Sequence, residues 1–353
     1  MPWQPTSQAW RSEPIQVMKK VLSGFAAAII LCAVGAAVFV WRMGYVPTSA
    51  AAKPHLQPAA FEPPPERDIP KGPFGDAVRL GENIFRDPGT YAAAYVGNDL
   101  RCSYCHLDAG KLAGAAPMWA AYVAFPAYRS KNHHVNSFQE RLQGCFQFSM
   151  NGKAPPLDGS ILIALESYSY FLAKGLPTGE PAPGRGYPAL PKPPLPADYA
   201  RGNEVYGQQC AACHGTDGQG QSVDGKVAFP PLWGARSYNW GAGMTSIETA
   251  AEFIRQNMPL NLGGTLSVQQ AWDVAAYIDS QNRPQDPRFT GDVAETREKY
   301  HDSPFSMYGR TIGGVVLGDP VITPPFGTVP AKASAAPAAG ATPKEPAAPE
   351  ETK

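Results

Sequence analysis

A five-residue pattern of two cysteines and a histidine occurs twice in the chain, and it carries the most specific chemistry in the sequence. The residues are Cys102, Cys105 and His106 in the first copy, and Cys210, Cys213 and His214 in the second. CxxCH is the attachment sequence of c-type haem, in which two thiols add across the vinyl groups and the adjacent histidine binds the iron. A zinc site would need a closed set of four ligands, and a redox dithiol has no use for the histidine. The sequence therefore predicts two covalently bound haem c groups with iron.

The second CxxCH copy is followed by two methionines that could reach the opposite side of its iron. In small helical cytochrome c domains this ligand is usually a thioether on the loop before the last helix. Met258 lies 44 residues after His214, directly before the expected closing helix. Met244 lies 30 residues after His214 and is the runner-up. We therefore expect Met258 to complete the second site.

The first copy is followed by two sulfur atoms five positions apart. Met150 lies 44 residues after His106, the same offset that separates Met258 from His214. Spacing by itself favours Met150 as the ligand and leaves Cys145 as a small buried hydrophobe, which is what free cysteines most often are.

Helical patterns surround both motifs in the same order. Residues 71–180 and 198–290 each open with Gly-x-x-[Ile/Val]-[Phe/Tyr], at Gly81 and Gly202, and each close with an apolar run of helical period. Seven of the seventeen residues at 181–197 are proline, which predicts a semi-rigid spacer. We expect an all-α protein with two tandem cytochrome c-like haem domains joined by this proline-rich linker.

The N-terminal 70 residues predict export and a membrane anchor. Residues 21–41 are uncharged and long enough to cross a bilayer as a helix, although a cleaved signal peptide is the competing interpretation. We expect a cytoplasmic arm at 1–20, a transmembrane anchor at 21–42 and a Pro/Ala-rich stalk at 43–70. This single-pass arrangement would place the haem domains on the periplasmic side of a bacterial inner membrane.

The C-terminal region and the overall charge carry weaker signals. Alanine and proline make up 14 of the last 26 residues, a composition that cannot bury enough apolar surface to offset the entropy of ordering. We therefore expect an extended, largely disordered tail at 291–353. Thirty basic and thirty acidic residues cancel, so the net charge gives no reason to expect a nucleic-acid partner.

Several short runs in the two predicted domains resemble one family. The runs are 141–152 (RLQGCFQFSMNG), 230–234, 237–244, 257–259 and 271–277. Over roughly residues 75–290 the chain resembles the dihaem cytochrome c thiosulfate dehydrogenases, which form tetrathionate. The resemblance implies that the catalytic haem has an axial cysteine, which falls on Cys145. It also implies Met258 for the second haem, because Asn257 stands where the family's alternative lysine would be.

The resemblance further implies an oxidoreductase that joins two thiosulfate dianions into tetrathionate, or works in reverse as a tetrathionate reductase. Electrons would pass from a catalytic domain at 71–180 through an electron-transfer domain at 198–290 to a soluble cytochrome c or a membrane oxidase. The alternative is a non-catalytic, membrane-anchored dihaem carrier with two His/Met haems. Such a carrier would have no need of Cys145.

Two dianions must be brought together against their repulsion, which calls for fixed cations near the first haem. Residues 101–153 contain six basic side chains and two acids. Arg129 and Arg141 are the best anion-binding candidates, because arginine offers a planar fork to oxyanions and both precede Cys145. Lys153 comes next. A solvated basic face, or partners for haem propionates, is the alternative interpretation of these cations.

Overall fold

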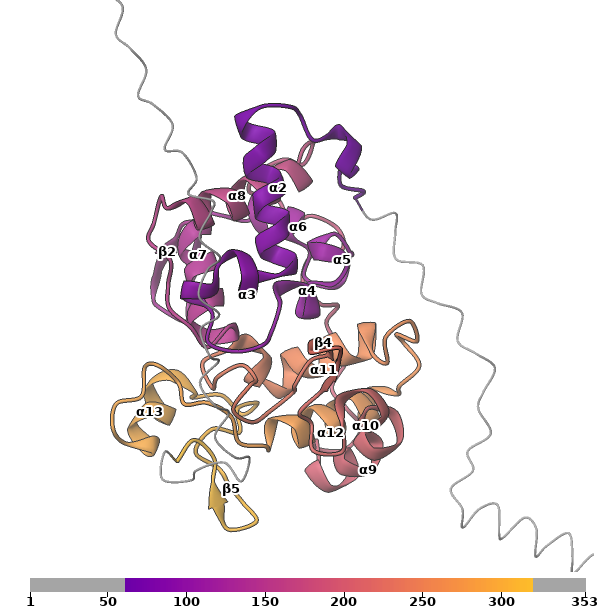
Figure 1. Ribbon diagram of the computed structural model, residues 1–353. Helices are drawn as coiled ribbons and strands as arrows, with labels where there is room; N and C mark the ends of the chain where they lie inside the picture. Colours follow the sequence, from indigo (N-terminus) through magenta and orange to yellow (C-terminus); the bar gives the residue numbers. More distant parts are fainter. Residues whose placement is uncertain (1–60, 320–353) are drawn as a thin grey trace, which may run out of the picture. The chain divides into compact units, whose positions relative to one another are not determined.

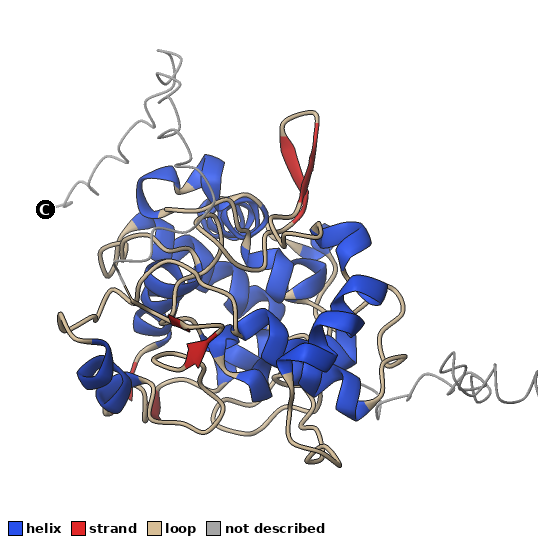
Figure 2. Cartoon of the chain, turned by 90° about the horizontal axis from the view of Figure 1, so that it is seen from below, coloured by secondary structure: helices blue, strands red, loops and turns tan. Residues whose placement is uncertain are grey.

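A computed structural model of the chain describes residues 61–319. Helices dominate this part, and its strands form three two-stranded antiparallel sheets (Figures 1 and 2). The prediction of a helix-rich protein is therefore confirmed for the described residues. The predicted arm at 1–20 and anchor at 21–42 lie outside the described residues. Within 61–319, no helix has both the length and the apolar character needed to span a bilayer.

The first domain is built around a pair of long helices, α2 (Pro73–Arg86) and α8 (Ser160–Leu172), coloured indigo and magenta in Figure 1. Shorter elements fill the sequence between them: α3 (Pro88–Tyr91), α4 (Cys102–Cys105), α5 (Leu107–Gly110), α6 (Met118–Val123), β1 (Ala127–Arg129), β2 (His134–Asn136), α7 (Phe138–Gly144) and the π-helix η3 (Cys145–Ser149), with the 3-10 turn η2 (Ala93–Tyr95). Val78, Ile84 and Phe85 give α2 a buried stripe at helical spacing.

The second domain repeats this plan with α9 (Tyr199–Gln209) and α12 (Val268–Asp279) as the long pair. Between them lie α10 (Ala211–His214), β3 (Gln221–Val223), β4 (Lys226–Phe229), η4 (Gly243–Thr245) and α11 (Ile247–Asn257). Helix α12 contributes Trp272, Val274 and Ile278 to the buried core of the second domain. A capping box between Ser267 and Gln270 fixes where α12 begins.

The repeated glycines make the long helix pairs possible in both domains. A Cβ on Gly81 would lie 2.0 Å from the carbonyl oxygen of Ala164 in α8, and a Cβ on Gly202 would lie 2.0 Å from that of Asp273 in α12. Because no side chain fits at that distance, only glycine lets the backbones approach so closely. The internal repeat in the sequence therefore corresponds to the same helix contact made twice.

The two domains share hydrogen bonds through three buried or half-buried asparagines. Asn239 donates to the carbonyl of Gln147 (2.8 Å), Asn98 donates to those of Ser149 (2.9 Å) and Ser237 (3.1 Å), and Asn257 donates to Gly114 (3.3 Å). Gln147, the acceptor from Asn239, belongs to η3, so the π-helix of the first domain is held partly by the second.

The expectation of an extended tail from residue 291 is wrong up to residue 319. This segment contains α13 (Val293–Tyr300), β5 (Thr311–Ile312) and β6 (Val315–Val316). Tyr308 is fully buried with its ring edge-on to Trp240, and Leu317 is also buried. The prediction of disorder rested on the alanine and proline content of residues 328–353. Residues 291–319 instead bury isolated apolar side chains, which follow no helical or strand period. Residues 320–353 lie outside the described residues.

The last ten residues of the predicted stalk also pack on the first domain. Residues 61–70 contain the 3-10 turn η1 (Glu66–Asp68), followed by the buried Ile69. The ring of Phe61 lies 5.3 Å from that of Trp119. The stalk prediction is therefore wrong for 61–70, where two isolated apolar residues among prolines find contacts that composition does not reveal.

Candidate functional site

The first CxxCH motif forms one wall of a cavity in the first domain. Cys102 and Cys105 begin and end α4, and His106 follows directly. Cys145, Met150 and Met244 line the same cavity. The Nδ1 atom of His106 lies 2.6 Å from the carbonyl oxygen of Ala116, which fixes the ring and leaves Nε2 available. A ring nitrogen bonded to a backbone carbonyl is the usual arrangement for a metal-binding histidine.

Burial sets the protonation of the groups in this cavity. It raises the pKa of Cys105 to about 11, and the nearby Cys145 adds to the effect. Burial and Cys145 raise the pKa of Cys102 in the same way. Burial also lowers the pKa of His106 to about 4, so the imidazole is neutral near pH 7. A neutral imidazole and two unpaired thiols are the donor set that a haem c attachment site requires.

Cys145 occupies a special position in the backbone. Helix α7 begins with a capping box, in which Ser137 and Glu140 exchange hydrogen bonds. It ends at Gly144, where the π-helix η3 begins with Cys145, and the amide of Met150 donates to the carbonyl of Cys145 at 2.9 Å. Single π-helical turns occur often at functional sites. The Nη1 atom of Arg141, one turn earlier, lies 2.8 Å from Cys145 Sγ.

The second CxxCH motif has the same local geometry. His214 ends α10, and its Nδ1 lies 2.9 Å from the carbonyl oxygen of Pro230. Burial lowers the pKa of His214 and raises that of Cys210 to about 11, whereas Cys213 is exposed. Met258 caps the end of α11 and packs against the second core.

Met244, the runner-up ligand for the second iron, is placed elsewhere. It lies in η4 and lines the cavity of the first CxxCH motif, in contact with both cores. The structure therefore puts Met244 at the first site, because the loop after Tyr238 crosses to the first domain. Sequence spacing could not show this crossing.

A second cavity, of about 620 Å³, adjoins the first one and shares Arg141, Ser149 and Gly243 with it. Arg129 and Arg141, both predicted to bind anions, line this cavity. Burial, followed by the charge of Arg141, lowers the pKa of Arg129. Lys153 is exposed and lies in neither lining, so the structure does not bring it together with the two arginines.

Comparisons with known proteins agree with this arrangement. Residues 197–278 match the family described as cytochrome C oxidase, cbb3-type, subunit III. Thiosulfate dehydrogenase of Thiomonas intermedia (strain K12) is 58% identical over 261 residues, which cover 74% of this chain and 83% of that protein. The chain belongs to the thiosulfate dehydrogenase family.

Other relatives support the same family. Thiosulfate dehydrogenase of Stutzerimonas stutzeri (strain A1501) is 52% identical across 74% of this chain and 86% of its own length. The structure of thiosulfate dehydrogenase (TsdBA) from Marichromatium purpuratum, in its as-isolated form, matches with a TM-score of 0.72 and 51% identity over 74% of this chain. The present chain spans 58% of the length of that protein. The family resemblance is thereby confirmed, haem c is supported as the cofactor, and the non-catalytic carrier is not favoured.

Sequence reasoning missed three cations of this thiosulfate dehydrogenase family member that line the second cavity. They are Lys131, Arg288 and Lys299. Lys131 was visible as one of six basic residues between 101 and 153 but had nothing to single it out. Arg288 and Lys299 lie more than 140 positions after Cys145, and no local pattern connects them to it.

Proposed function

We propose that this chain oxidises two thiosulfate dianions to tetrathionate at the first CxxCH site and passes the electrons through the second. The observation that supports this proposal is the position of Cys145. Its sulfur lies in the cavity of Cys102, Cys105 and His106, at hydrogen-bond distance from Arg141 and beside a cavity rich in cations. Because an electron carrier needs neither this cysteine nor an adjoining anion site, the arrangement favours an enzyme.

Two haem c groups are part of the proposal. Cys102 and Cys105 would attach the first and Cys210 and Cys213 the second, with His106 and His214 on the irons. Cys145 would also bind the first iron, and Met258 the second. Each bound haem would supply a one-electron redox centre, so two of them match a reaction that releases two electrons.

The protein's own residues gather and orient the substrate. Arg141 provides fixed positive charge at the junction of the two cavities, and Arg129 provides it in the second cavity. These charges lower the cost of bringing two dianions together. Arg141 also donates to Cys145 Sγ, so one guanidinium both holds the sulfur and faces the anions. The buried wall formed by Leu142, Phe146 and Met150 excludes water from this end of the site.

Different sulfur ligands on the two irons would set the direction of electron flow. Thiolate ligation lowers an iron potential, and thioether ligation raises it. Electrons would therefore pass from the first domain to the second, and then to a soluble cytochrome c or a membrane oxidase. The same centres could work in reverse as a tetrathionate reductase, depending on the potentials of the partners.

The deciding experiment replaces each of the two candidate sulfur ligands, Cys145 and Met150, in a separate variant. Cys145→Ala should reduce thiosulfate-dependent dye reduction to below detection while both haems remain attached. Low-temperature electron paramagnetic resonance should show that it also removes a thiolate-type low-spin signal. Met150→Leu is the matched control, since a volume-conserving swap costs less than about 1.5 kcal/mol. It should keep both the signal and most of the activity. The reverse result would make Met150 the ligand and leave an electron carrier.

The proposal includes a location. Residues 21–42 would anchor the chain in the inner membrane of a bacterium with the haem domains in the periplasm, because residues 21–41 are uncharged and long enough to span a bilayer. Tethering would raise the effective concentration of the second haem near a membrane oxidase. Extraction of membranes with alkaline carbonate tests this location, since release of the full-length protein would contradict an anchor.

A further inference from the structure

Part of the lining of the cation-rich cavity comes from the C-terminal segment. Arg288, Lys299 and Tyr300 line the same cavity as Arg129 and Arg141. Arg288 precedes α13, and Lys299 and Tyr300 are its last two residues. The cavity beside Cys145 is therefore closed by residues that follow both haem-binding motifs in the sequence.

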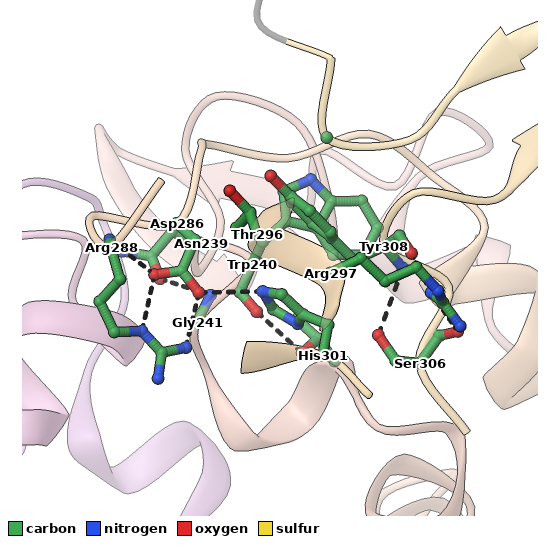
Figure 3. A network of polar contacts seen from close by, with 12 residues as sticks. Asn239, Trp240, Gly241, Asp286, Arg288, Thr296, Arg297, His301, Ser306 and Tyr308 are labelled. Carbon is green, nitrogen blue, oxygen red and sulfur yellow. Dashed lines mark hydrogen bonds and ion pairs between the residues drawn. The ribbon is translucent and has the colours of Figure 1, made fainter. Parts of the chain in front are cut away.

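A buried carboxylate holds Arg288 in place. Asp286 is fully buried and accepts from Arg288 Nε at 3.0 Å and Nη2 at 2.6 Å (Figure 3). His301 Nε2 lies 3.0 Å from the same carboxylate, and the His301 ring stacks on Tyr308 with centroids 4.2 Å apart. Burial opposes ionisation of Asp286, but these hydrogen bonds outweigh it and hold its pKa well below the usual value.

The bidentate contact leaves one end of the guanidinium free. Nη1 of Arg288 has no hydrogen-bond partner within residues 61–319, and the side chain is 19% exposed. Because Nε and Nη2 face Asp286, the planar group directs Nη1 away from the carboxylate. Arg288 is thus both fixed and able to donate to a ligand.

Phe148 links this wall to the π-helix that begins with Cys145. Two cations lie over its ring, with Lys131 Nζ at 4.4 Å and the guanidinium carbon of Arg288 at 4.8 Å from the centroid. The ammonium of Lys131 also donates to the carbonyl of Gly241. Lys131 and Arg288 therefore both contact the ring of a residue only three positions from Cys145.

The charges of the cavity favour a multivalent anion. Five cationic side chains line it: Arg129, Lys131, Arg141, Arg288 and Lys299. Glu140 is the carboxylate in the lining, and it is occupied by the cap of α7 and by His134 at 3.1 Å. Even with Asp286 counted behind Arg288, positive charge exceeds negative charge by three. A volume of about 620 Å³ compares with about 30 Å³ for one water in the liquid, so there is room for a further oxyanion beside one at Cys145.

We propose that Lys131, Arg288 and Lys299 form a second oxyanion subsite, which binds the terminal SO₃ group of the second thiosulfate, and that of tetrathionate, while the first thiosulfate lies at Cys145. This inference rests on the proposed function. It assigns the C-terminal segment a direct part in substrate binding and gives each of the two dianions its own set of cations.

The test removes single charges of the proposed subsite in the full-length holoenzyme. Arg288→Gln and Lys299→Gln should each raise the KM for thiosulfate, with the loss of a charged hydrogen bond at Arg288 raising it about tenfold. Arg288→Lys should restore part of the affinity, because it keeps the positive charge but not the planar, bidentate guanidinium. Arg310→Gln and Lys174→Gln are the matched controls, since both residues are exposed and lie outside the lining.

A binding measurement without turnover complements the kinetics. Lys299 of the oxidised holoenzyme is acetylated with an activated ester and followed by mass spectrometry, with and without sulfate as an inert dianion. Sulfate should slow acetylation of Lys299 in the wild type but not in Arg288→Gln, and it should leave Lys174 unaffected.

Two results would overturn the subsite. One is an unchanged KM in both Arg288→Gln and Lys299→Gln while the wild type oxidises thiosulfate, and the other is equal acetylation of Lys299 with and without sulfate. Failure of the proposed function looks different, because the wild type itself would then not oxidise thiosulfate.

Discussion

The ammonium of Lys131 is a titratable group of the anion cavity that changes charge near neutral pH. Burial, assisted by the positive charge of Arg288, lowers its pKa to about 8. Asp286 opposes this shift, and Arg141 and Arg129 add to it. His301 also faces Lys131, but burial holds the pKa of His301 below its usual value, so it is already neutral above pH 7.

The sign of the expected pH dependence follows from these charges. Lys131 is charged below pH 8 and neutral above it, whereas thiosulfate remains a dianion. We expect kcat/KM for thiosulfate to fall as pH rises through about 8, because that ratio reports groups of the free enzyme. Lys131→Arg stays charged, so its kcat/KM should not fall through about pH 8 in a profile measured from pH 6.5 to 9.5. An identical fall of kcat/KM in both proteins would show that another group causes it.

At the scale of elements, the contact between α9 and α12 depends on a single missing side chain. Gly202 and Gly207 both lie in α9, but only Gly202 faces α12, where a Cβ would lie 2.0 Å from the carbonyl oxygen of Asp273. No atom lies within 4 Å of the corresponding position on Gly207. The same helix thus offers a matched pair of substitutions.

We expect the two alanine variants to shift stability in opposite directions. Gly202→Ala should lower the free energy of unfolding by about 1 to 3 kcal/mol or more, since the helix must move to admit the methyl group. Gly207→Ala should raise it by about 0.5 to 1 kcal/mol through helix propensity. Urea unfolding followed by far-ultraviolet circular dichroism measures both, and equal effects would show that the close helix contact is absent.

On the scale of the whole molecule, Asn239 couples the two haem domains. It is 1% exposed, and its Nδ2 donates to the carbonyl of Gln147 at 2.8 Å and to Asn151 Oδ1 at 3.0 Å. Its Oδ1 accepts from the amide of Gly241, next to the residues that hold Arg288. Removing this amide would leave buried polar groups of both domains without partners.

Asn239→Ala should therefore loosen both domains rather than one. An unsatisfied buried group costs about 1 to 3 kcal/mol, and we expect faster hydrogen exchange in α8 of the first domain and in α12 of the second. Asn203→Ala, on the exposed side of α9, is the control and should leave both rates unchanged. Faster exchange confined to the second domain would mean that the domains open independently.

Local sequence determined the parts of this protein whose chemistry is contiguous. The CxxCH motifs fix two thiols and an imidazole within five residues, and the repeated glycines at 81 and 202 mark helix contacts that recur in each domain. The run around Cys145 was specific enough to indicate the family. These features were predictable because neighbouring residues in a helix or tight turn have nearly fixed relative positions.

The tertiary structure alone decided what surrounds Cys145. Met244 reaches the first cavity from the second domain, and Lys299 reaches the anion cavity from a segment predicted to be disordered. Arg288, which lies just before that segment, lines the same cavity. Tyr308 and the buried Asp286 anchor that segment through single contacts that follow no helical or strand period. Such contacts depend on how the whole chain packs, and a sequence pattern records only which neighbours along the chain share a face.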